Sequence, residues 1–248
     1  MEKKQRRLSD SLAIIPARAG SKSIKNKNLR LFHGKPLIAW TIAQAIDSQV
    51  SRAIVTTDSN EIRDVAIKYG AEVPYLRSKE LSNDTAAIEP VITDVLAYLE
   101  KSQNYIPDCV VLLMPTSPLR LVSDIDNALN IYRKSNLSSV VSVSRAVANQ
   151  NPHWMLKKNK DGTVSLFTGK NLSEIASRRQ NLPDVYFRND FVYVLDPNNL
   201  CQNPANLYGD MVELLVADDG RVELDINNES DWLAAETIFK VTNQFAGE

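Results

Sequence analysis

The chain has 248 residues, of which 44% are hydrophobic and 24% are charged, and its formal net charge is −1. These values are typical of a globular protein with a sizeable core, and they exclude a disordered chain and a coiled coil. The near-neutral charge disfavours a nucleic-acid partner, and no apolar run reaches the roughly 18 residues of a membrane helix. Two cysteines are too few for a disulfide framework, and the first ten residues lack the apolar segment of a signal peptide. We therefore expect a cytoplasmic protein.

Apolar runs and helical periodicities alternate through the chain. Short continuous apolar runs predict buried strands, and apolar residues spaced three or four positions apart predict helices. The expected strands are residues 12–16, 53–57, 72–76, 110–114, 139–143, 191–195, 212–216 and 221–224. The expected helices begin at Pro36, Asp58, after Thr85, at Ser123 and near Ser230, with Asp58 and Ser123 as N-terminal caps.

The order of these elements predicts the fold. Strands that alternate with helices and lack a polar face are typical of an α/β protein with a mostly parallel, Rossmann-like sheet and helices on both faces. Residues 146–188 are polar and contain an Asp161-Gly162 turn, and we expect a small β-rich excursion there within a single domain, residues 11–248. Ligands of such sheets bind beyond the carboxyl ends of the strands, so the segments that follow the strands are the places to search.

Positive charge is concentrated near the start of the chain. Lys and Arg exceed Asp and Glu by eight in residues 1–35, so the remainder carries a net charge of −9. We interpret residues 1–10 as a disordered basic tail, because runs of like charge repel one another and stay solvated. The cations from Arg18 onward follow a predicted strand, and they suggest an anion-binding loop.

The first candidate motif, IIPARAGSKSIKNKN, contains these cations. Gly20 allows an open turn that exposes main-chain N–H groups, and Arg18 can bind a phosphate through two nitrogens at once. Lys22 and Lys27 add point charges. The combination suits a triphosphate, although it matches neither the Walker loop nor the dinucleotide-binding glycine pattern, and a solvated basic loop would have a similar composition.

The second motif, CVVLLMPTSPLR, carries a buried strand into a loop stiffened by two prolines. The loop would place Thr116, Ser117 and Arg120 at the end of that strand. A well-made strand-to-helix connection explains the same pattern without a ligand.

The third motif is VELDINNESDW. In an extended chain Asp225 and Asn227 point to the same side, so both oxygens could reach one hard cation. A capped turn is the alternative, and Asp231 is expected to belong to the start of the last helix.

Together with LRSKELSNDTA (76–86) and RRQNLPDVYFRND (178–190), these motifs resemble the acylneuraminate cytidylyltransferases, or CMP-sialic acid synthetases, over about residues 11–240. That family joins CTP to the anomeric hydroxyl of a 2-keto-3-deoxy sugar acid and releases pyrophosphate. The resemblance implies a nucleotide-diphospho-sugar transferase type of sheet, Mg²⁺ as cofactor, and a homodimer in which the excursion reaches across to the partner. The implied substrates are CTP and a nine-carbon sugar acid of the sialic, legionaminic or pseudaminic type.

The resemblance also implies roles for individual residues. The nucleotide site would comprise Arg18, Ser21, Lys22, Lys27, Asn28 and Arg77, with Asp84 and Thr85 in the loop that follows. The sugar site would comprise Thr116, Ser117, Arg120, Arg179, Gln180 and Asn189. Mg²⁺ would be held by Asp225 and Asn227, and the residues expected to act in catalysis are Arg18, Lys27 and Asp225. We expect the anomeric oxygen to attack the α-phosphorus in line with the departing pyrophosphate, so positioning and charge neutralisation dominate.

Several positions depart from the family pattern. Ser23 stands where a glycine is usual, so that turn must avoid a positive φ or bear strain. Met114 replaces a glutamine beside the sugar, Asp190 replaces a glycine, and Asn227 replaces a second aspartate. These changes weaken sialic acid itself as the substrate. They leave two alternatives, a sugar-1-phosphate guanylyltransferase and a non-catalytic protein that binds nucleotide sugars.

Overall fold

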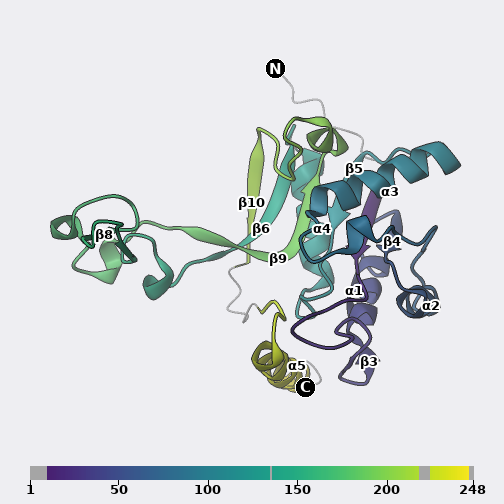
Figure 1. Ribbon diagram of the computed structural model, residues 1–248, viewed down its shortest axis with the longest axis horizontal. Helices are drawn as coiled ribbons and strands as arrows, with labels where there is room; N and C mark the ends of the chain where they lie inside the picture. The colour runs from purple at the N-terminus through teal and green to yellow at the C-terminus, as the bar shows by residue number, and fades with distance from the viewer. Residues whose placement is uncertain (1–9, 135, 218–223, 246–248) are drawn as a thin grey trace.

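The computed structural model describes residues 10–134, 136–217 and 224–245, and its centre is a six-stranded sheet (Figure 1). The strand order is β10-β6-β9-β5-β1-β4. The bounds are β1 Ser11–Pro16, β4 Arg52–Thr56, β5 Cys109–Leu112, β6 Ser139–Arg145, β9 Tyr186–Leu195 and β10 Val212–Val216. Strands β5, β1 and β4 pair in parallel, as do β10 and β6, whereas β9 runs antiparallel to both of its neighbours. The predicted mostly parallel sheet is confirmed, with one antiparallel strand inside it.

Helices cover both faces of the sheet. They are α1 Leu37–Ile46, α2 Asn60–Lys68, α3 Ile88–Gln103, α4 Val122–Lys134 and α5 Glu229–Phe245. Because successive side chains of a strand point to opposite faces, β1 contributes to two cores. Ala13 and Ile15 pack with α1, α2 and α4, whereas Leu12 and Ile14 pack with α3 on the other face. The continuous apolar pattern of the strand follows from this double burial.

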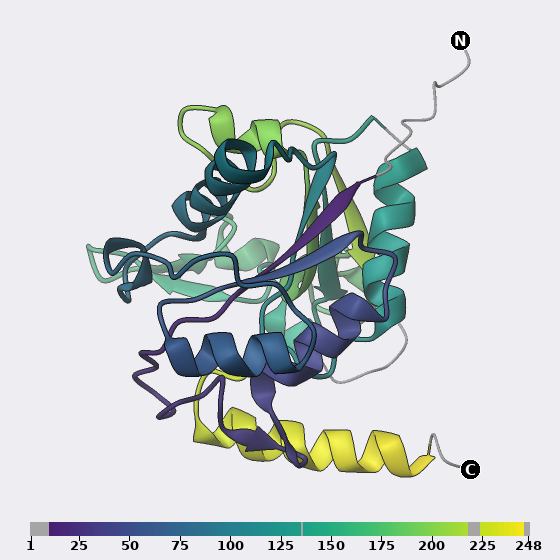
Figure 2. The ribbon, with the colours of Figure 1, turned by 90° about the vertical axis from the view of Figure 1, so that its right-hand side faces the viewer.

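Helix α5 lies against the short strands β2 (Leu31–Phe32) and β3 (Lys35–Pro36), at the edge of the molecule in Figure 2. Trp232 of α5 is buried in a third apolar cluster, and its ring contacts Phe32 edge-on with 5.7 Å between the ring centroids. Ile24 and Ile226 belong to the same cluster. This packing holds the segment before α5 beside the loop that follows β1.

The predicted excursion is an arm that extends away from the sheet (Figure 1). Strands β6 and β9 continue to pair along its base, as far as Arg145 opposite Tyr186. Beyond them lies a hairpin of β7 (Leu156–Lys158) and β8 (Val164–Leu166). Gly162 in its turn has φ +86°, which glycine adopts without strain, so the predicted Asp161-Gly162 turn is confirmed.

Three predicted elements differ in the structure. Residues 72–76 form only two isolated bridges beside β4, since Pro74 has no N–H to donate to a ladder. Helix α1 begins at Leu37, so Pro36 is its N-cap residue and not part of its first turn, whereas α3 begins at Ile88, after Thr85 as expected. Helix α4 begins at Val122, so Ser123 lies within its first turn.

Two predictions fall largely or wholly outside the described residues. These are the basic tail, of which only residue 10 is described, and the strand at 221–224, of which only residue 224 is described. Among the described helices, none is long and apolar enough to cross a membrane.

Candidate functional site

A cavity of about 270 Å³ opens where β1 and β5 end. Its walls come from the loop after β1, the residues after β5, the segment 77–87 and the first turn of α3. This is the edge of the sheet at which a ligand was expected. The cavity brings together predicted site residues from separate motifs, namely Arg18, Ser21, Lys27, Asn28, Arg77 and Thr116.

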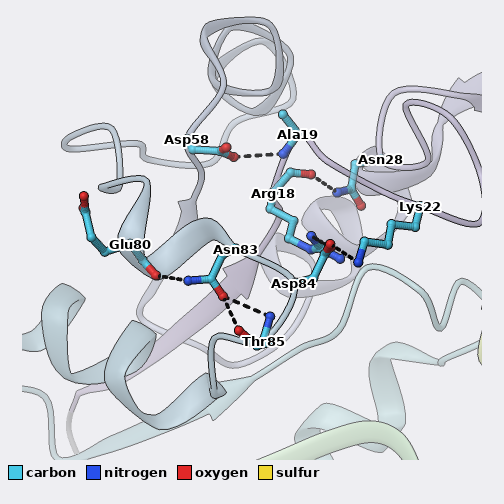
Figure 3. A network of polar contacts seen from close by, with 9 residues as sticks. All are labelled: Arg18, Ala19, Lys22, Asn28, Asp58, Glu80, Asn83, Asp84 and Thr85. Atoms are coloured by element: carbon cyan, nitrogen blue, oxygen red, sulfur yellow. Dashed lines mark hydrogen bonds and ion pairs between the residues drawn. The ribbon is translucent and has the colours of Figure 1, made fainter.

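The cations of the loop after β1 meet an acidic partner across the cavity. Arg18 and Lys22 both form ion pairs with Asp84, and the Lys22 Nζ lies 2.5 Å from Asp84 Oδ2 (Figure 3). Hydrogen bonds from Lys22 and Arg18 lower the pKa of Asp84, so this carboxyl stays ionised. One carboxylate therefore holds two of the three cations that were predicted to bind a triphosphate.

The backbone angles of this loop are compatible with the residues that stand in it. Asn26 takes the left-handed conformation, with φ 53°, and asparagine tolerates it better than most residues. Ser23 is not among the residues with positive φ, so the serine in place of glycine is accommodated without that strain. Gly20 also keeps a negative φ, and a Cβ there would come no closer than 3.9 Å to Arg18. The conformation of the loop therefore does not require its glycine.

Lys27 joins the loop to the segment before α5. Its Nζ donates a hydrogen bond of 2.8 Å to the Ile226 carbonyl, while the Ile226 N–H donates to the Thr116 carbonyl at 2.9 Å. Burial lowers the pKa of Lys27, and the negative charge of Asp225 partly opposes that shift. Both polar groups of Ile226 are thus bound, which fixes Asp225 next to the cavity wall.

Asp225 has an unusual carboxylate. Its Oδ1 is buried and makes no hydrogen bond within the described part of the chain, and its Oδ2 accepts one of 2.8 Å from Asn227 Nδ2. Asp231 Oδ2 instead accepts from the N–H groups of Asn227 and Asn228, at the start of α5. The expected role of Asp231 at the helix start is confirmed.

Arg77 forms another wall of the cavity. It is buried, its Nε donates to Ser82 Oγ at 3.1 Å, and its N–H donates to the Thr57 carbonyl at 2.8 Å. Burial lowers the pKa of this guanidinium, and the nearby charge of Asp58 is the largest opposing influence. Arginine nevertheless stays protonated, because its pKa starts above 12.

The loop after β5 divides its polar side chains between the cavity and the interior. Thr116 lines the cavity, but Ser117 is fully buried and its hydroxyl donates to the Asp190 carbonyl. Arg120 is 2% exposed and donates to the carbonyls of Met114 and Phe191. It borders a separate cavity of about 390 Å³ between α1, this loop and α5. The structure therefore does not bring the Arg120 guanidinium to the first cavity.

The remaining predicted sugar residues also lie away from that cavity within one chain. Arg179 and Gln180 are exposed on the arm. Asn189 is buried at the base of the arm, where its Nδ2 donates to Ser144 Oγ at 2.9 Å and its Oδ1 accepts from the Phe191 N–H. Its amide is thus engaged with the two strands that carry the arm.

Asp58 has a contact that the sequence did not predict. It was expected to cap α2, but Ser59 is the cap, and its Oγ accepts from the Ile62 N–H. Asp58 Oδ1 instead accepts a hydrogen bond of 2.8 Å from the Ala19 N–H. Its place at the end of a predicted strand was a signal that could have assigned it to the site.

The chain is similar to known cytidylyltransferases over most of its length. A family model described as Cytidylyltransferase matches residues 12–202. The chain is 34% identical to the CMP-N,N'-diacetyllegionaminic acid synthase of Legionella pneumophila over 94% of this chain and 97% of that protein. It is 31% identical to the N-acylneuraminate cytidylyltransferase of Escherichia coli over 94% of this chain and 53% of that protein. Among solved structures, the CMP:2-keto-3-deoxy-manno-octonic acid synthetase complexed with CTP shares the fold, with a TM-score of 0.68 at 16% identity, and the match covers 94% of this chain and 100% of that one.

Proposed function

The chain belongs to the cytidylyltransferase family and is a nucleotidyltransferase, and on that premise we propose that it transfers CMP from CTP to a nine-carbon 2-keto-3-deoxy sugar acid. The anomeric hydroxyl of the sugar attacks the α-phosphorus, and pyrophosphate leaves. The observation that carries this proposal is that Arg18 and Lys27 line one cavity beyond the strand ends, and that Lys22 pairs with Asp84 in its wall. A triphosphate is the ligand class that such a group of cations suits.

The chain's own residues bind and orient the nucleotide in this proposal. Arg18 and Lys22 exchange Asp84 for the β- and γ-phosphates, whose charge grows as pyrophosphate departs. Lys27 lines the same cavity and adds a third charge, and Arg77, in another part of its lining, would contact the base. None of these groups has to form a covalent bond, because phosphoryl-type transfer depends chiefly on positioning and charge.

Mg²⁺ is the cofactor that we propose, and the residues before α5 fit it. The buried Asp225 Oδ1 has no hydrogen-bond partner among the described residues. A bound cation would satisfy this oxygen. Rotating the Asn227 amide would put its oxygen, in place of its nitrogen, beside the Asp225 carboxylate. No group of three or more His, Cys, Asp or Glu suited to a metal occurs in the described ranges. Such a group is not needed for Mg²⁺, because this ion commonly binds through one or two carboxylates together with phosphates and water. Once held by Asp225 and Asn227, the ion would neutralise charge on the triphosphate. We expect EDTA to stop pyrophosphate release and added Mg²⁺ to restore it.

The proposed sugar is a diacetamido acid of the legionaminic type. Met114 lines the cavity with an apolar side chain, which accepts an acetyl methyl group more readily than it accepts a hydroxyl. The similarity to the Legionella pneumophila synthase over nearly the full length of both proteins supports the same class. Pseudaminic and sialic acids are the competing acceptors.

We also propose a homodimer in the cytoplasm, where CTP is available. The arm leaves large apolar side chains exposed, including Leu156, Phe167 and Leu172, and a second copy would cover them. The same contact would bring Arg179 and Gln180, which are exposed on the arm and do not line their own chain's cavity, to the partner's sugar acid. Mixing Asp225→Ala protein with Arg179→Ala protein should then restore part of the activity, because a mixed dimer contains one intact site. Mixtures no more active than the separate variants would contradict the shared site.

Pyrophosphate release measured for CTP and GTP against a panel of acceptors tests the function. The panel contains legionaminic, pseudaminic and sialic acids and one aminosugar phosphate. Release with CTP and a nine-carbon acid supports the proposal. Release with GTP and the aminosugar phosphate would identify a guanylyltransferase instead, and CTP binding without release from any acceptor would identify a non-catalytic relative.

A further inference from the structure

The peptide group between Arg18 and Ala19 is held by side chains at both of its polar atoms (Figure 3). Its N–H, on Ala19, donates to Asp58 Oδ1 at 2.8 Å. Its carbonyl, on Arg18, accepts from Asn28 Nδ2 at 3.1 Å. Two side chains from different segments therefore fix the plane of one peptide in the loop after β1, which we call the phosphate loop because the proposed function assigns its cations to the triphosphate.

The place of this peptide explains why side chains are needed there. Strands β1 and β4 remain connected as far as the Ala17 N–H, which donates to the Thr56 carbonyl at 3.0 Å. Beyond that rung the loop turns away from the sheet. Asp58 lies just past the end of β4, and its carboxylate replaces the main-chain acceptor that the ladder no longer provides. Because Ser59 caps α2, the Asp58 side chain is not required by the helix.

Asp58 also lies near a second functional cation. The Arg77 N–H donates to the Thr57 carbonyl, one residue before Asp58. The charge of Asp58 raises the pKa of Arg77, whereas the charge of Arg18 lowers it. The carboxylate therefore reduces repulsion between the arginine of the phosphate loop and the arginine of the base side.

We propose that Asp58 is a positioning residue for nucleotidyl transfer, which orients the Arg18–Ala19 peptide and through it the Arg18 guanidinium. The inference rests on the proposed function, because it assigns Arg18 to the triphosphate. A peptide free to rotate would let the guanidinium adopt several directions, and misplacement of a charged group by about 1 Å can cost on the order of a hundredfold in rate. Ala19 is exposed, so water can replace the lost acceptor and the fold does not depend on the contact.

Three variants separate this role from a structural one. Asp58→Ala removes the acceptor, Asp58→Asn keeps an acceptor oxygen without the charge, and Ser59→Ala removes the α2 cap as the matched control. We expect Asp58→Ala to lower kcat/KM for CTP by about 10- to 100-fold, mostly in kcat, with an unchanged urea midpoint. Asp58→Asn should recover most of that loss. Ser59→Ala should lower the urea midpoint and leave kcat/KM unchanged.

Two results would overturn the inference. One is a wild-type kcat/KM in Asp58→Ala. The other is an Asp58→Asn protein as impaired as Asp58→Ala, because the Asn variant retains the acceptor and the loss would then come from the missing charge beside Arg77. Calorimetric measurement of CTP binding to the same proteins distinguishes a failure of the proposed function from a failure of the positioning role of Asp58. A wild type that binds CTP but releases no pyrophosphate would refute the proposed function, and the CTP affinities of the Asp58 variants would then decide the positioning role. A wild type that does not bind CTP would refute both.

Discussion

Replacing Arg120 by methionine tests whether this arginine serves the fold. The guanidinium is buried, with its Nη2 2.7 Å from the Met114 carbonyl and its Nη1 3.1 Å from Gln44 Oε1, and its Nε donates to the Phe191 carbonyl. These acceptors come from the end of β5, from α1 and from β9. Arg120 thus connects three elements around the loop that carries Thr116.

The cost of the substitution follows from the groups left behind. Two main-chain carbonyls lose a donor, at about 1–3 kcal/mol each, and removal of a buried charge returns part of that amount. We expect Arg120→Met to lower the free energy of unfolding by about 2–4 kcal/mol. For a chain of this length that corresponds to a fall in Tm of roughly 5–15 °C.

Urea unfolding followed by circular dichroism measures this difference. Arg63→Met is the matched control, because Arg63 pairs with Asp64 on the surface of α2 and such pairs contribute at most about 1 kcal/mol. An Arg120→Met protein with a wild-type urea midpoint and a raised KM for the sugar acid would refute the reasoning. It would show that the guanidinium leaves the interior to bind substrate.

Three further predictions concern the cavity. Asp84→Asn should release Arg18 and Lys22 and tighten CTP binding by calorimetry about two- to fivefold at low salt, whereas weaker binding would mean that Asp84 itself contacts the nucleotide. Asp225→Ala should abolish pyrophosphate release without moving the urea midpoint, and undiminished release would exclude Asp225 from the metal site. Because burial lowers the pKa of Lys27, its charge and its share of CTP binding should be lost, as pH rises, below the 10.5 of an ordinary lysine. Lys27→Arg should keep kcat/KM for CTP constant across that alkaline range, and an unchanged decline in the variant would assign the titration to another group.

The sequence predicted those site residues that directly follow a parallel strand. Arg18 and Thr116 each follow a continuous apolar strand, and parallel strands end at one edge of a sheet, so their meeting was foreseeable. The sequence could not show which of two adjacent residues caps helix α2. Asp58 and Ser59 can both cap a helix, and their roles separate only in the folded chain, where Asp58 binds the Ala19 N–H after the neighbouring strand and Ser59 caps α2.

The sequence also could not predict which polar side chains are buried. The sequence places Arg120 in a loop, where an exposed guanidinium is the ordinary expectation. Its burial depends on acceptors that lie far away along the chain, including the carbonyl of Phe191, 71 residues later. Asn189 is similar, because its partner Ser144 is reached only when β6 and β9 pair. Contacts of this range are set by tertiary structure and leave no local pattern.

The hydrogen bond from Lys27 to Ile226 joins residues that lie 199 positions apart, so it can form only after nearly the whole chain has been synthesised. As a ribosome releases the chain, strands β1, β4 and β5 are available to form much of the sheet long before residue 226 emerges. During that interval the loop after β1 lacks its contact with the segment before α5, and Asp225 has not yet been synthesised. If Asp225 holds the metal as we propose, a nascent or truncated chain that has already formed most of the sheet will release no pyrophosphate until the last tenth of the sequence has been added.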